Sequence, residues 1–185
     1  MRFSEDAAKR ICRATLSRWT AKGLIRKDGT DEALVSKMAA ALMADVAKEE
    51  ALDREVEALL DKHARELDAT QANSRLLFQK IKTRLADERG MVVGALQQSD
   101  DRRGHWARLQ IARLKKEALA AFADESAVQR EARAVLDAWA KAADEADRTA
   151  RAKIAGQSRR VPEGGREWDI LYRKYFEEEM ARRNL

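Results

Sequence analysis

The feature that most constrains this chain is its shortage of residues that interrupt helices. Its 185 residues include 1 Pro and 8 Gly, whereas a many-stranded sheet or barrel needs frequent turns built on these two residue types. Apolar residues recur at spacings of three and four, which is the period of an amphipathic helix. We therefore predict an all-α protein of about six helices, arranged as an elongated bundle with little or no β structure.

The composition excludes several classes of protein. Hydrophobic residues make up 45% of the chain, but many of them are Ala, so few large side chains remain for a core. Lys and Arg number 37 against 32 Asp and Glu, and these charges interrupt every apolar stretch before it could span a membrane. Acids near the N-terminus do not fit a secretory signal, so we expect a cytoplasmic protein. The single cysteine, Cys12, is expected to be a buried structural thiol.

An internal repeat organises the chain. A shift of 94 residues places Leu42 on Leu136 and Asp53 on Asp147, and the same shift persists into a third segment, where Leu77 meets Leu171. At the front of each half the shift is 95. We predict two tandem three-helix repeats, residues 1–94 and 95–185, formed by duplication. Shared Ala-rich composition is the alternative explanation of the matches.

Capping residues predict where the helices begin. Ser4 is a suitable N-cap for a first helix, near residues 4–22, and Thr30 and Asp124 are suitable N-caps at equivalent places in the two halves. The predicted ranges are 31–66 and 125–156 for the long second helices, and 73–90 and 166–183 for the third helices. A stretch around residues 90–104 is the predicted linker between the halves.

Two segments have basic residues and no acid, residues 7–27 and 102–116. Each contains a tryptophan, Trp19 or Trp106, so a basic surface with an aromatic side chain could bind phosphates or another anionic partner. The candidate anion contacts are Arg13, Arg18, Arg108 and Arg113. The competing interpretation is an ordinary solvated helix whose opposite charges lie on the neighbouring long helix.

The C-terminal segment is the most distinctive part of the sequence. A turn containing Pro162, Gly164 and Gly165 precedes a helix with one wide aromatic and apolar face. Its candidate docking or partner-binding residues are Pro162, Gly164, Gly165, Trp168, Tyr172 and Tyr175. The face either packs on the long helices of its own half or forms a groove for a partner. Acid-first pairs such as Glu179 and Arg183 predict that the opposite side is solvated.

This segment also carries a resemblance to a known family. Residues 159–180, RRVPEGGREWDILYRKYFEEEM, closely resemble the C-terminal signature of the bacterial domain of unknown function 507 family, and the opening MRFSE resembles the start of that family. The resemblance implies an all-helical bacterial cytoplasmic protein without an assigned activity. It supplies no catalytic or ligand residues to carry over.

The sequence offers little chemistry. His63 and His105 are far apart and the repeat does not pair them, and no zinc, phosphate-loop or nucleophile motif is present in the sequence. We therefore predict no catalytic, cofactor-binding or metal-binding residues and no enzymatic activity.

We predict a macromolecular interaction or scaffold protein with an unknown protein partner. The alternative is sequence-tolerant binding of RNA or DNA through the basic first helices. No membrane association is expected, and the chain could be a monomer or a homodimer.

Overall fold

A computed structural model describes residues 3–63, 74–157, 159 and 161–183. Six helices lie in this part of the chain: α1 (Glu5–Ala21), α2 (Asp31–Lys62), α4 (Ser74–Glu88), α5 (Asp100–Lys116), α6 (Glu125–Ala155) and α7 (Arg166–Arg182). Two short strands, β1 (Ile25–Lys27) and β2 (Ala120–Phe122), accompany them. The predicted all-α class is confirmed. The predicted end of a helix at residue 66 and start of another at 73 lie outside the described residues.

Helix α1 and the long helices α2 and α6 begin where the sequence places their caps. The side chain of Ser4 accepts a hydrogen bond from the backbone N–H of Ala7, and Thr30 and Asp124 accept equivalent bonds at the starts of α2 and α6. Each bond satisfies a backbone donor that has no partner within its own helix. The local signals therefore determine the starts of three helices.

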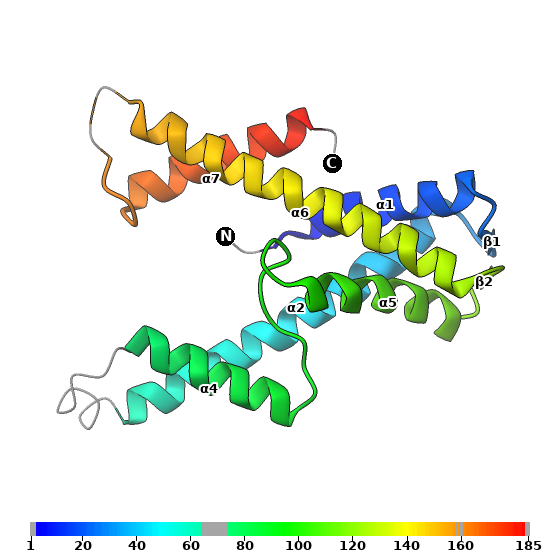
Figure 1. Cartoon of the computed structure of the whole chain (residues 1–185), viewed down its shortest axis with the longest axis horizontal. Coiled ribbons are helices and arrows are strands. Elements are labelled where there is room, and N and C mark those ends of the chain that lie inside the picture. The colour runs from blue at the N-terminus through cyan, green and yellow to red at the C-terminus, as the bar shows by residue number, and fades with distance from the viewer. Residues whose placement is uncertain (1–2, 64–73, 158, 160, 184–185) are drawn as a thin grey trace.

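Four helices supply most of the main core. Helices α1, α5, the first half of α2 and most of α6 lie around one hydrophobic cluster (Figure 1). Its largest fully buried side chains are Trp19, Trp106, Ile11, Leu34, Met38, Leu42, Leu114 and Leu136. Cys12 is also buried there, as predicted. The core draws on both predicted repeats, whose boundaries at 94 and 95 stay a prediction.

Two helical arms extend beyond this core on one side (Figure 1). In one arm, α4 packs on the second half of α2 around a separate small cluster of Leu52, Val56 and Ala86. In the other, α7 packs along α6, and its Phe176 and Met180 join the main core. The arm of α6 and α7 therefore shares the main core, whereas the arm of α2 and α4 has a small core of its own.

The segment between the halves is shorter than predicted. Helix α4 ends at Glu88 and α5 begins at Asp100, so Gly104 belongs to a helix and not to the linker. Ser99 caps α5, and Asp100 and Asp101 favour its positively polarised N-terminus. A Cβ at Gly104 would lie 3.2 Å from Nη1 of Arg133 on α6. Gly104 therefore lets Arg133 of α6 lie close to α5, and it does not form a turn.

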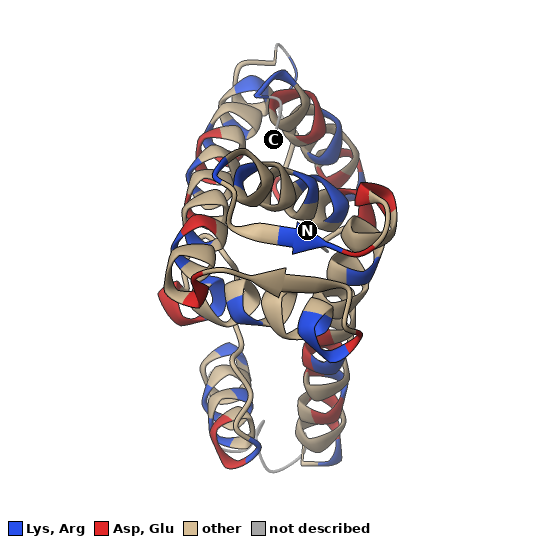
Figure 2. Ribbon diagram, turned by 90° about the vertical axis from the view of Figure 1, so that its right-hand side faces the viewer, with Lys and Arg blue, Asp and Glu red and all other residues tan. Residues whose placement is uncertain are grey.

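The two strands join the halves with a two-fold pattern. They are antiparallel, and Arg26 pairs with Ala121, the residue 95 positions later (Figure 2). The flanking backbone bonds are also exchanged, since Asp28 donates to Leu119 at 2.8 Å and Ala123 donates to Leu24 at 3.2 Å. Two copies of one unit around a local two-fold axis would have this pattern. Duplication itself stays a prediction.

The turns before the strands provide a matched pair of substitutions. Gly23 and Ala118 are 95 positions apart, and both have positive φ, of 63° and 54°. Because this conformation strains a residue with a Cβ, we expect Ala118→Gly to raise the free energy of unfolding by about 0.5–1 kcal/mol. Gly23→Ala should lower it by about 1 kcal/mol, although nothing lies within 4 Å of the added Cβ. Urea unfolding followed by circular dichroism measures both, and shifts of the same sign would contradict the strain argument.

Candidate functional site

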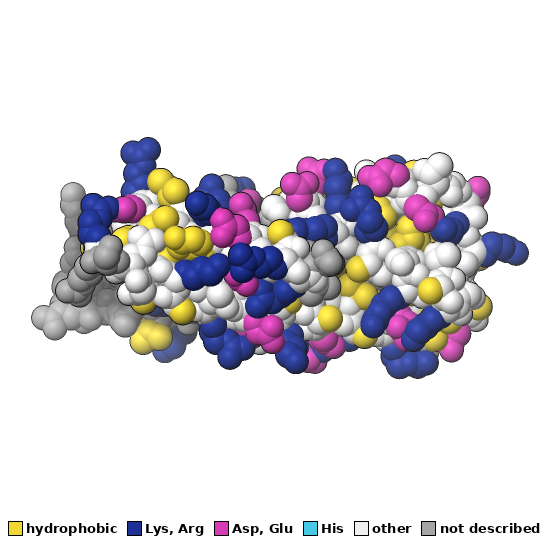
Figure 3. Space-filling model, turned by 90° about the horizontal axis from the view of Figure 1, so that it is seen from above, with side chains coloured by type: hydrophobic (Ala, Val, Ile, Leu, Met, Phe, Trp, Pro, Cys, Tyr) yellow, Lys and Arg dark blue, Asp and Glu magenta, His cyan; other side chains and the backbone are white. Residues whose placement is uncertain are grey.

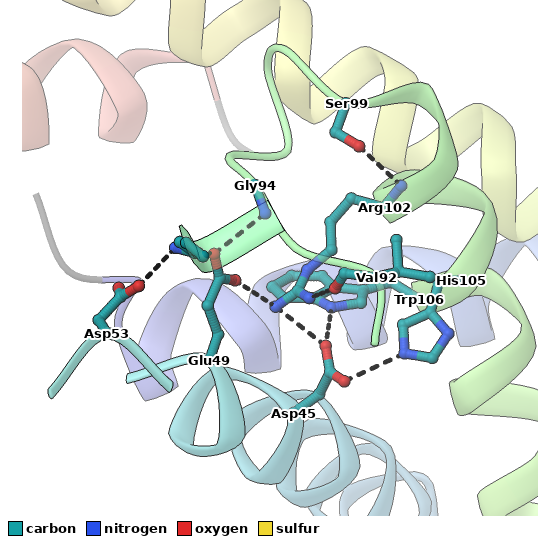
Figure 4. A network of polar contacts seen from close by, with 10 residues as sticks. Asp45, Glu49, Asp53, Val92, Gly94, Ser99, Arg102, His105 and Trp106 are labelled. Carbon is teal, nitrogen blue, oxygen red and sulfur yellow. Dashed lines mark hydrogen bonds and ion pairs between the residues drawn. The ribbon is translucent and has the colours of Figure 1, made fainter. Parts of the chain in front are cut away.

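A ladder of three carboxylates runs along the middle of α2 (Figure 4). Asp45, Glu49 and Asp53 are spaced by four residues, which places them on one side of the helix. They lie where the arm of α2 and α4 leaves the main core. Basic and aromatic side chains from α4 and α5 converge on this ladder and form an extensive polar cluster with it.

Arg102 is the centre of this cluster. It is 2% exposed, and its Nη2 atom lies 3.0 Å from Asp45 Oδ2 and 2.9 Å from Glu49 Oε2. Its Nη1 atom donates to the backbone carbonyl of Val92 in the segment between α4 and α5. One guanidinium therefore connects α5, α2 and the interhelical segment, using the several donors that Arg presents in a fixed geometry.

Lys82 connects α4 to the same ladder. Its Nζ lies 2.7 Å from both Glu49 Oε1 and Asp53 Oδ1. Burial alone would lower the pKa of Lys82, but hydrogen bonds and charges from Asp53 and Glu49 outweigh burial and raise this pKa. Glu49 Oε1 also accepts from the backbone N–H of Gly94 at 3.0 Å. Lys82 therefore stays a cation and holds the arm in place.

Residues of α5 bind Asp45, the carboxylate of the ladder nearest the N-terminus of α2. Asp45 Oδ1 lies 3.0 Å from Nε2 of His105, and Asp45 Oδ2 accepts from Nε1 of the buried Trp106 at 2.8 Å. The ring of Trp106 in turn packs edge to face with Phe3, at a centroid distance of 4.8 Å. The ladder thus ends against the aromatic part of the core.

These groups form a joint that connects α2, α4 and α5. An open hollow of about 730 Å³ lies nearby, between α2 and α4, and Lys82 is the one member of the cluster's side chains that lines it. A lysine whose pKa is raised is a poor nucleophile at neutral pH. Burial likewise raises the pKa of the Cys12 thiol. In the part of the chain with described coordinates, no group of three or more His, Cys, Asp or Glu residues is arranged to hold a metal ion.

The predicted C-terminal turn leads directly into α7. Gly165 is the N-cap of the helix, and its N–H donates to the carbonyl of Pro162 at 3.3 Å. Gly164 has φ of 82°, a conformation that favours glycine. Gly165 has φ of −82°, which other residues also adopt. Pro162 and Gly164 are exposed.

The aromatic residues of α7 face α6. Trp168 and Tyr172 stack at 4.8 Å with an interplanar angle of 9°, and the guanidinium of Arg151 on α6 lies over both rings. The hydroxyl of Tyr172 donates to Asp147 at 2.5 Å, and that of Tyr175 accepts from Gln157 at 3.0 Å. Burial and the Asp147 carboxylate raise the pKa of Tyr172. Trp168, Tyr172 and Tyr175 are half-buried, because they dock α7 on its own half.

The prediction of a solvated side for Glu179 is wrong. Glu179 is 6% exposed, because Lys153 of α6 reaches across to its carboxylate at 2.8 Å. Arg182 and Arg183 also pair with it. Hydrogen bonds from Lys153 and Arg183 hold the pKa of Glu179 below its usual range. It is an electrostatic contact between α6 and α7.

The family model described as "Protein of unknown function (DUF507)" matches residues 1–185. The chain belongs to this family. The match extends well beyond the C-terminal signature and includes the joint of α2, α4 and α5. Comparison with curated proteins gives no match. In the described part of this DUF507 member, no helix combines the length and the apolar character needed to cross a membrane.

Three of the four candidate anion contacts of this DUF507 member form ion pairs within the chain. Arg13 pairs with Glu32 of α2 at 3.3 Å, Arg18 with Glu131 of α6 at 3.7 Å, and Arg113 with Glu117 at 2.6 Å. Arg108 is exposed on α5. For Arg13 and Arg18, the opposite charges lie on the long helices, as the competing interpretation expected.

The expectation that Trp19 and Trp106 are available on a basic surface is wrong. They are 0% and 2% exposed, because both lie on the apolar stripe of their helix and face the core. The joint around Arg102 was not predicted. Its one signal in the DUF507 sequence is the spacing of Asp45, Glu49 and Asp53, while their partners lie far along the chain.

Proposed function

We propose that this chain is a non-catalytic protein of the DUF507 family that acts by binding another macromolecule through its helical arms. The observation that carries this proposal is the extension of two helical hairpins beyond a shared core (Figure 1). Each arm exposes a large aliphatic side chain. Leu76 on α4 is 57% exposed, and Ile170 on α7 is 61% exposed. These two positions are 94 residues apart, as in the predicted repeat.

The state of the polar groups supports binding over catalysis. The carboxylates at the joint are bound by Arg102, Lys82 and His105, and Tyr172 is engaged with Asp147. A general acid or base has to reach a substrate with its proton position free. Because these groups are bound to one another, we expect them to hold the arms in position and not to react with a substrate.

Nucleic-acid binding through the first helices is the second candidate. Ion pairs at Arg13, Arg18 and Arg113 weaken it, because those charges are partly neutralised within the chain. Cationic and anionic side chains are also interspersed over the face seen in Figure 3, which does not offer a continuous basic surface. If the chain does not bind nucleic acid through its first helices, wild type and Arg108→Glu should have the same effect on the gel mobility of DNA or RNA at low salt. A salt-sensitive shift that this variant abolishes would favour nucleic-acid binding instead.

Co-purification tests the main proposal. We expect the full tagged chain, expressed in its source cell, to retain a partner at a defined stoichiometry that can be rebuilt from the purified components. The double variant Leu76→Glu/Ile170→Glu should lose this partner. A matched control, Ala112→Glu/Ala134→Glu, changes two exposed positions on core helices and should keep it. The same result for both variants would contradict binding through the arms.

A bacterial origin, a cytoplasmic location and the oligomeric state remain expectations from the sequence. Sedimentation of the purified chain distinguishes a monomer from a homodimer.

A further inference from the structure

The outer face of α7 presents an apolar side chain that the fold does not use. The inner face of the helix is occupied by Phe176 and Met180, which are buried, and by the aromatic residues stacked against α6. Ile170 points away from these residues and is 61% exposed, the largest exposure of a large hydrophobic residue in the described chain. An exposed aliphatic residue is ordinary by itself, so its surroundings decide whether it forms part of a site.

Three of the four helix neighbours of Ile170 are cations. On a helix surface its neighbours are the residues three and four positions away, which are Arg166, Glu167, Arg173 and Lys174. Arg166, Arg173 and Lys174 are exposed, and no acid of the described chain forms an ion pair with any of them. Glu167 forms an ion pair with Arg159. The three cations are therefore available to an external anion.

Building on the proposed function, we propose that this patch, Ile170 with Arg166, Arg173 and Lys174, binds an acidic amphipathic helix of a partner protein. An apolar side chain on that helix would cover Ile170, and carboxylates one turn away on each side would meet the cations. Both surfaces would follow the same spacing of three and four residues, as two packed helices do. The charge of the patch selects an acidic helix over a neutral or basic one.

The surroundings of the patch disfavour an extended anionic surface. Asp169, Glu177 and Glu178 are exposed on the same helix, and a nucleic-acid backbone or a lipid surface that covered the whole helix would meet these acids. Phosphates also gain nothing from contact with an aliphatic side chain, whereas a leucine or an isoleucine on a partner helix does. A helix that crosses α7 at Ile170 contacts the residues about one turn away on either side, so it can meet the three cations without lying along the whole helix.

The experiment uses the full chain and a defined probe. The probe is a fluorescent 18-residue helical peptide with a leucine stripe flanked by glutamates, and its anisotropy is titrated with protein at low salt. We expect weak, saturable binding, because a contact of this size lies well below the area of stable interfaces. Binding should weaken at least about tenfold in Ile170→Glu and in Arg173→Glu/Lys174→Glu. Raising the salt should weaken it as well, because exposed charges are screened.

Matched controls separate this patch from general attraction to a basic protein. Lys141→Glu removes an exposed cation from α6 and should bind the peptide like the wild type. A peptide with lysines in place of the glutamates should not bind. Circular dichroism and melting curves that match the wild type would show that each variant is folded.

Other outcomes overturn the inference. Absence of peptide binding at millimolar protein would do so, as would equal binding by wild type and Ile170→Glu. Tighter, patch-dependent binding to single-stranded DNA or to vesicles containing phosphatidylglycerol would identify an anionic surface as the ligand instead. If the single variant Ile170→Glu still retains the co-purified partner, this patch is excluded while the proposed binding through the arms survives.

Discussion

Replacing Trp19 by alanine is expected to lower the free energy of unfolding by about 3–5 kcal/mol, the range for removing a large buried aromatic side chain. Trp19 is 0% exposed. Its Nε1 donates to the carbonyl of Val128 on α6 at 2.9 Å, and its ring packs edge to face with Phe122 of β2 at 5.5 Å. One side chain therefore joins α1 to both elements, and its loss leaves a cavity where they meet.

The measurement is urea unfolding followed by circular dichroism, with thermal melting as a second readout. For a chain of this size, a loss of 3–5 kcal/mol corresponds to a fall in Tm of roughly 6–20 °C. Trp19→Phe keeps most of the ring and loses the hydrogen bond, so its cost should be about 1–2 kcal/mol. Trp168→Ala is the matched control, because Trp168 is half-buried at the far end of an arm. A loss below about 1 kcal/mol for Trp19→Ala would contradict the conclusion that Trp19 joins α1 to α6 and β2 in the core.

The sequence predicts the helices well because their signals are local. The caps at Ser4, Thr30 and Asp124 lie next to the backbone donors that they satisfy, so no distant residue is needed to place them. The burial of Cys12 was likewise predicted from its place on a helix among apolar neighbours, and the structure confirms it. Helical period and capping are both properties of a few consecutive residues.

The sequence fails where a feature depends on distant partners. Ile25–Lys27 and Ala120–Phe122 are too short to show a strand pattern, and each pairs only because the packed helices bring the two together. Gly104 resembles a linker residue until the guanidinium of Arg133 is placed against it. Glu179 has the local pattern of an exposed ion pair, and it becomes buried because Lys153 approaches from α6.

At the candidate site, too, the sequence predicts local features but not contacts between distant residues. The aromatic face of α7 was visible from its spacing, but the sequence could not choose between an internal and an external contact for Trp168 and Tyr172. The position of Arg151 over both rings decides for an internal contact. Ile170 directly precedes Leu171 and Tyr172 in the sequence, so nothing local marks it as exposed. Its exposure becomes evident only once the inner face of α7 is covered.

Replacing Arg102 by methionine should also lower the free energy of unfolding by about 3–5 kcal/mol, for an electrostatic reason. Methionine fills much of the same volume, so packing around the site changes little. Asp45 and Glu49, whose side chains are 15% and 16% exposed, would lose their shared cation. Lys82 would remain beside Glu49 and Asp53, so one lysine would face three carboxylates and part of their negative charge would be uncompensated. Breaking a buried ion pair in this way costs more than the pair itself contributes.

Rescue distinguishes this electrostatic cost from a packing defect. In Arg102→Met, the further change Glu49→Gln removes one uncompensated charge and should recover a measurable part of the lost stability, whereas Glu49→Gln in the wild-type background should be destabilising. The matched control is Arg84→Met, since Arg84 is 83% exposed and pairs with Glu88 on its own helix; its cost should stay below about 0.5 kcal/mol. Hydrogen exchange should accelerate most at residues 89–94, because Arg102 and Glu49 hold Val92 and Gly94 there. If the double variant were no more stable than Arg102→Met, the loss would come from packing, and the joint would not depend on its charges.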